Sequence, residues 1–126
     1  MSDPRPGPVT AFINERKALI FCLRAQSCAL RRDPENAGAV AVVLRELVDT
    51  VYRLRAASMA MAVDARASPY VFAMPWGFYS YDVPRMCDDL VACLLHWADI
   101  LVNTDGRRTD DIVVRSLESV LFTLNL

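Results

Sequence analysis

The sequence is poor in the residues on which most catalytic and metal-binding sites depend. It has a single histidine, His96, and only four glycines among 126 residues. So few glycines leave no glycine-rich phosphate loop, and the lone histidine has no serine or acid at the spacing of a catalytic triad. We therefore predict a protein that is not an enzyme and has no catalytic residue, metal or cofactor.

Long hydrophobic runs and net charge are also missing. No apolar stretch approaches the roughly 20 residues that span a bilayer, and residues 1–8 lack the apolar core of a secretion signal. We expect an intracellular protein, cytoplasmic or nuclear, unless the chain is a mature secreted form. A net charge of −1 gives no steering toward nucleic acid and little repulsion between copies. The expected partners are a protein and a second copy of the chain, as a homodimer.

Lysine is nearly absent, because thirteen arginines stand against Lys17 alone. This bias indicates a GC-rich coding genome, although arginine also suits desolvated interfaces. Two cysteine pairs, Cys22 with Cys28 and Cys87 with Cys93, have the same six-residue spacing. Six helical residues turn roughly 600°, which sets the two thiols about 120° apart around the axis. We therefore expect four reduced, mostly buried thiols.

Four stretches show the apolar periodicity of amphipathic helices, and none reads as a strand. The first runs from a Thr10 cap to about Arg31, the second from an Asp33 cap to about residue 66, the third from an Asp82 cap to about Asn103, and the fourth from Thr109 to the end. The sequence predicts an all-α fold: a flexible lead-in over 1–8, then a single-domain four-helix bundle over 9–126.

The second predicted helix has the most regular pattern. Its apolar positions alternate by four and three residues, which keeps one stripe against a neighbouring helix: Val40, Leu44, Leu47, Val51, Leu54, Ser58, Met61 and Ala65. The first helix has a second stripe, Lys17, Arg24 and Arg31, which repeats every seven residues. We interpret this basic stripe as a solvated face.

The long connection between the second and third helices is rich in aromatics and has no charge between Ser68 and Asp82. Pro69, Pro75 and Gly77 break helices there. The connection either plugs the core or anchors a partner. We predict partner binding through its aromatics and the methionines beside it: Tyr70, Phe72, Trp76, Phe78, Tyr79, Tyr81, Met59 and Met61.

One motif inside this connection suggests an alternative function. Trp76-Gly77 is similar to the Trp-Gly core of a motif in Bcl-2-like helical proteins, which bind an amphipathic helix in a surface groove. Pro75 and Phe78 stand where that motif has Asn and Arg, so the match covers two residues. The resemblance implies a groove-type helix-binding regulator, and we keep it as an alternative.

A second alternative is a helical enzyme or small-molecule binder with a pocket under residues 68–82. Two acidic doublets, Asp88-Asp89 and Asp110-Asp111, are the candidates for metal-phosphate chemistry. Each doublet also lies near a helix start, where acids offset the helix dipole. Cys93 and His96 share a face with Asp89, yet a structural zinc site needs a fourth ligand. Convergence of these side chains in one concavity would favour this alternative.

Overall fold

The computed structural model describes residues 7–64, 82–103 and 109–125, and the elements in these ranges are all helical. The elements are α1 (Pro8–Arg32), a short 3-10 turn η1 (Pro34–Asn36), α2 (Ala37–Asp64), α3 (Asp82–Asn103) and α4 (Thr109–Asn125). The predicted all-α class is confirmed for this part of the chain, which contains no strand. Within the same ranges, no helix has both the length and the apolar character that crossing a bilayer requires.

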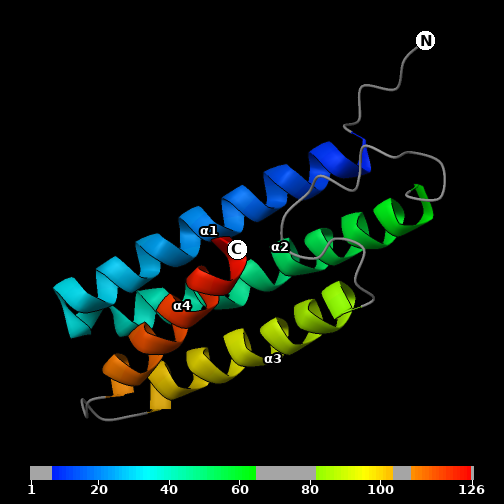
Figure 1. Cartoon of the computed structure of the whole chain (residues 1–126). Coiled ribbons are helices and arrows are strands. Elements are labelled where there is room, and N and C mark those ends of the chain that lie inside the picture. The colour runs from blue at the N-terminus through cyan, green and yellow to red at the C-terminus, as the bar shows by residue number, and fades with distance from the viewer. Residues whose placement is uncertain (1–6, 65–81, 104–108, 126) are drawn as a thin grey trace.

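The helices run antiparallel to their neighbours along the chain (Figure 1). α2 lies between α1 and α3 and packs extensively against both, whereas α4 packs mainly against α1. The contact between α3 and α4 is the smallest of these helix pairs. α4 therefore packs mainly on α1, and the surface of α4 that faces α3 is incompletely covered.

α1 begins earlier than the sequence predicted. Gly7 is its N-cap and Pro8 its first residue, whereas Thr10, the predicted cap, lies inside the first turn and is exposed. Proline is favoured at this position because its φ angle already suits a helix and the missing N–H has no helical partner to lose. The first α1 hydrogen bond runs from Ala11 N to Gly7 O at 2.9 Å. The Thr10 prediction was therefore wrong.

Asp33 caps the turn between α1 and α2 as predicted, but the element that it caps is the 3-10 turn η1 and not the α-helix itself. Asp33 Oδ1 accepts a hydrogen bond from Glu35 N at 3.0 Å. The three residues that follow form the 3-10 turn, so the α-helix starts at Ala37 and not at Pro34. Asn36 accounts for the tighter turn, because its Nδ2 donates to Ala29 O of α1 at 2.9 Å and holds the turn against that helix.

The core is one apolar cluster to which all four α-helices contribute. The alternating stripe predicted on α2 is buried at every position whose side chain is described, namely Val40, Leu44, Leu47, Val51, Leu54 and Ser58. Its polar member, Ser58, donates its hydroxyl to Arg55 O at 2.7 Å. The largest fully buried side chains on the other helices are Phe12, Leu19, Leu23, Leu30, Leu94, Leu117 and Leu124.

Ion pairs on the surface join neighbouring helices. Among the described residues they are Arg53–Glu15 between α1 and α2, Arg45–Asp99 and Arg55–Asp88 between α2 and α3, and Arg31–Glu118 between α1 and α4. Such exposed pairs are each worth up to about 1 kcal/mol, so they orient the helices more than they stabilise them. Lys17 and Arg24 of the predicted basic stripe are exposed as expected.

Candidate binding groove

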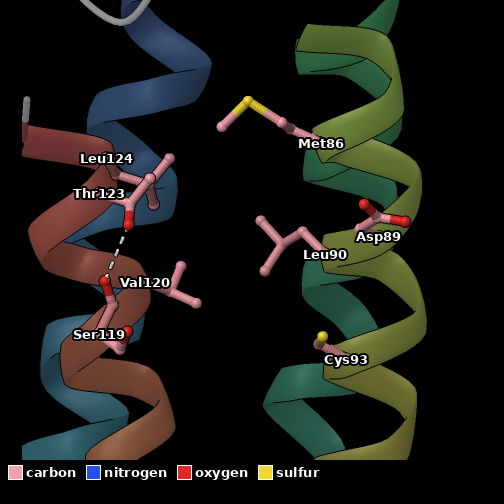
Figure 2. Close-up of a pocket in the computed structure, with 8 residues that line it drawn as sticks. All are labelled: Met86, Asp89, Leu90, Cys93, Ser119, Val120, Thr123 and Leu124. Atoms are coloured by element: carbon pink, nitrogen blue, oxygen red, sulfur yellow. Dashed lines mark hydrogen bonds between the residues drawn. The ribbon is translucent and has the colours of Figure 1, made fainter. Parts of the chain in front are cut away.

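An apolar groove lies between α3 and α4, where the contact between these helices is weak. Its volume is about 210 Å³. Eight of the described residues line it: Met86, Asp89, Leu90 and Cys93 from α3, and Ser119, Val120, Thr123 and Leu124 from α4. Figure 2 shows Leu90 and Val120 pointing toward each other across the gap, with Met86 and Leu124 at one end. The groove thus runs between α3 and α4, and each helix forms one of its walls.

The spacing of the apolar lining residues follows the helix period. Met86, Leu90 and Cys93 are related by four and three residues on α3, and Val120 and Leu124 by four on α4. Residues at these intervals lie on one side of a helix. Each wall of the groove therefore presents a continuous apolar ridge.

Two polar contacts attach α4 to α1. Near the C-terminal end of α4, Arg16 Nη2 of α1 donates a hydrogen bond to the Leu124 carbonyl oxygen. Earlier on α4, Glu118 pairs with Arg31 of α1. Through these two contacts, one side of α4 packs against α1. The opposite side of α4, which carries Val120 and Thr123, lines the groove.

The rim of the groove is polar and carries one charge. Thr123 Oγ1 donates to the Ser119 carbonyl oxygen at 3.1 Å, so this hydroxyl hydrogen is already used within α4 (Figure 2). Among the lining residues that the structure describes, only Asp89 is charged, and its side chain is exposed. Its neighbour Asp88 points elsewhere, because its Oδ1 lies 3.0 Å from Arg55 Nε of α2.

The aromatic residues predicted to bind a partner lie outside the described residues: Tyr70, Phe72, Trp76, Phe78, Tyr79 and Tyr81. Met61 lies within α2, where only its backbone is described. Met59 is 47% exposed, and Arg55 Nη1 lies 3.1 Å from its Sδ. An exposed Met59 is available to a partner, and the partner-binding role of all these residues stays a prediction.

The candidate chemical groups do not converge in the described part of the chain. Asp89 and Cys93 line the groove, but His96 is exposed on α3 and is not a lining residue. Asp111 is also exposed, and the Asp110 side chain lies outside the described residues. The ranges that the structure covers hold no cluster of three or more potential metal ligands. The condition that would favour metal-phosphate chemistry is therefore not met by these residues.

The four thiols are free, as expected, but most are not buried. Cys87 is buried in the core, Cys22 and Cys93 are half-buried, and Cys28 is exposed. The prediction of mostly buried thiols was thus wrong, because Cys28 lies on the exposed side of α1 and the core covers Cys22 and Cys93 only in part. Burial, followed by the nearby charge of Asp88, raises the pKa of the Cys87 thiol to about 11, although Arg55 opposes this rise.

The groove itself was not predicted. Met86 and Cys93 recur at helical spacing with the buried Leu90, yet both are only half-buried, because α4 leaves this flank of α3 uncovered. Ser119 and Thr123 had no assigned role. The apolar arc of α3 is wider than one neighbouring helix covers, and this width was the available signal for a second contact surface.

Comparison with known proteins gives no relative for this chain. No protein-family model matches it, and no curated protein or solved structure does either.

Proposed function

We propose that this protein is a non-enzymatic protein–protein interaction module, built as a small four-helix bundle, that binds the apolar face of a partner helix in the α3–α4 groove. The observation that carries the proposal is the groove itself. Two ridges of apolar side chains line it, Met86, Leu90 and Cys93 on one wall and Val120 and Leu124 on the other. Met86, Cys93 and Val120 are half-buried, whereas Leu90 and Leu124 are buried beside them. A ridge of side chains from a third helix fits between two such helices.

Other common modes of peptide recognition suit the groove less well. Addition of a strand needs an exposed sheet edge, and the described ranges contain no strand. Polyproline ligands dock on aromatic surfaces, whereas none of the eight described lining residues is aromatic. A helix-in-groove interaction needs apolar walls with helical spacing, and these are present.

The size of the groove favours side-chain anchors over a free small molecule. Pockets that bury drug-sized ligands have volumes of roughly 300–1,000 Å³. The groove offers about 210 Å³. A cavity of about 150 Å³ holds a benzene-sized group, so this groove suits one or two large apolar side chains that stay attached to a helix outside it.

The proposal can be tested with a displayed library of amphipathic helices of about 18 residues, long enough to be helical. The intact chain serves as bait, and each enriched helix is titrated against the wild type and against Val120→Arg. The long arginine fills the groove from its α4 wall. We expect binding to weaken by about 10-fold or more, as for loss of an interface hot spot.

The matched control is Val42→Arg, the same substitution at a residue of α2 that is 52% exposed and away from the groove. It should leave affinity within about 2-fold. If Val120→Arg loses its helical circular dichroism, Ser119→Arg replaces it, because Ser119 is exposed on the rim. Failure to enrich any helix, or affinity unchanged in the groove variants, would overturn the proposal.

A second proposal concerns self-association through α2. Met59 and Tyr52 are 47% and 52% exposed and are seven residues apart, so they share a face of α2. We propose that this face, together with the aromatic connection, binds a second copy of the chain. Sedimentation at tens of micromolar, an order suited to common affinities, should show a dimer that Tyr52→Glu dissociates. A wild-type chain that stays monomeric would contradict this.

A further inference from the structure

We infer that the partner helix carries a basic side chain that pairs with Asp89. This inference rests on the proposed function, because it describes what the groove selects. Asp89 is the only charged residue in the described part of the lining. It is exposed at the solvent margin, next to Leu90 on the apolar wall. A lysine or arginine flanking the apolar ridge of a docked helix would meet this carboxylate as the ridge enters the groove.

The other acids of α3 and α4 whose side chains are described are either paired with an arginine of a neighbouring helix or, like Asp111, are not lining residues of the groove. On α3, Asp88 pairs with Arg55, and Asp99 pairs with Arg45 at 3.2 Å. On α4, Glu118 pairs with Arg31. Asp89 has no ion-pair partner within the described ranges, and Arg85, one helical turn earlier, forms no ion pair with it there. As far as the described ranges go, no cation of this chain occupies the carboxylate at the groove, and a cation from a partner can pair with it.

Because Asp89 lies at the rim, an ion pair with a partner's lysine or arginine would affect selectivity more than affinity. A charge pair at an interface margin contributes little to affinity but rejects partners of the wrong charge. A helix with an acid at the same place would set two carboxylates side by side. The groove would then accept basic amphipathic helices and reject acidic helices with the same apolar face.

The library described above tests this when its polar positions are randomised among Lys, Glu and Gln. One selection uses the wild-type chain and a second uses Asp89→Lys. We expect Lys to be enriched at one position of the helices that bind the wild type, and Glu at that position with Asp89→Lys. A helix selected on the wild type should bind Asp89→Lys about 5- to 10-fold more weakly, and the effect should shrink in high salt.

The matched control is Glu46→Lys, which replaces an exposed acid on α2 with the same change of net charge, from −1 to +1. It should keep the lysine preference of the wild type. Groove-dependent helices without any charge preference, or with the same preference on Asp89→Lys, would overturn this inference and leave the proposed function standing. If no groove-dependent helix is enriched, the proposed function itself fails.

Discussion

Arg16 of α1 holds the end of α4, because its Nη2 donates to the carbonyl oxygen of Leu124, 108 residues later in the chain. The last carbonyl groups of a helix have no partner within it. Here a cation from another helix satisfies one of them and also offsets the negative end of the helix dipole. The contact is partly buried, and desolvation lowers the pKa of the Arg16 guanidinium from its usual value.

Replacement of Arg16 by alanine should loosen the end of α4. The change removes a hydrogen bond from a charged donor, and we expect it to lower the free energy of unfolding by about 1.5–3 kcal/mol. Arg24→Ala is the control, since Arg24 is exposed on the same helix. It should change stability by less than about 0.5 kcal/mol. Urea unfolding measures both, and faster amide exchange in the last turn of α4 should accompany the Arg16 change alone.

Two phenylalanines on α1 provide a test of the packing. Phe12 is fully buried, whereas Phe21 is 76% exposed. We expect Phe12→Ala to cost about 3–5 kcal/mol through lost burial and a cavity, and Phe21→Ala to change stability by about 0.5 kcal/mol or less. Denaturant midpoints of the two variants should differ accordingly. Similar losses for both would mean that α1 packs through a different face.

Cys87 should make stability depend on alkaline pH. Its folded thiol has a pKa of about 11 against an ordinary value of 9.0, so the folded state holds the proton more tightly. This contribution is complete below pH 9 and is lost as the pH rises through about 11. The loss should be on the order of 1–2 kcal/mol. Cys87→Val should lack this fall, whereas Cys28→Ser, at an exposed thiol, should keep it.

The reactivity of the cysteines gives an independent check on this environment. In the folded protein near pH 8, the exposed Cys28 should react rapidly with iodoacetamide, and Cys87 should not react until the chain unfolds. Mass spectrometry of the modified peptides distinguishes the two sites. Rapid modification of Cys87 in the folded state would contradict both its burial and its raised pKa.

Trp76, outside the described residues, separates the two interpretations of the aromatic connection. If it anchors a partner, as we predict, Trp76→Ala should change the free energy of unfolding by under about 1 kcal/mol. If it plugs the core, the loss should be about 3–5 kcal/mol. Unfolding can be followed by the fluorescence of Trp97, which is 8% exposed in the folded state. A large loss would remove the main reason to regard this connection as a binding surface.

The helical class was predictable because local periodicity and helix-start residues agree along most of the chain. The apolar stripe that includes Val40, Leu44 and Val51 correctly indicated which face of α2 is buried. The errors lie at helix starts, where the Gly7-Pro8 pair displaced Thr10 and the Asn36 contact with α1 shortened α2. The positions of these two helix starts depend on local backbone geometry and on one tertiary contact. Hydrophobic periodicity does not encode either of them.

The groove was not predictable, because it depends on which neighbouring helix α4 packs against. The periodicity of Val120 and Leu124 shows an apolar face but not its neighbour. The choice is made by pairwise contacts such as Arg31 with Glu118, between residues 87 positions apart. Met86 and Cys93 have the helical spacing that core residues also have, and in the fold they line the groove.

The packing of α4 on α1 also bears on how the chain folds. Its contacts join the first and last helices, so they close the largest loop in the fold and carry the greatest entropic cost. The α1–α2 hairpin closes across a turn of a few residues and can form early. We therefore expect α4 to dock late, and substitutions at Glu118 to speed unfolding more than they slow refolding.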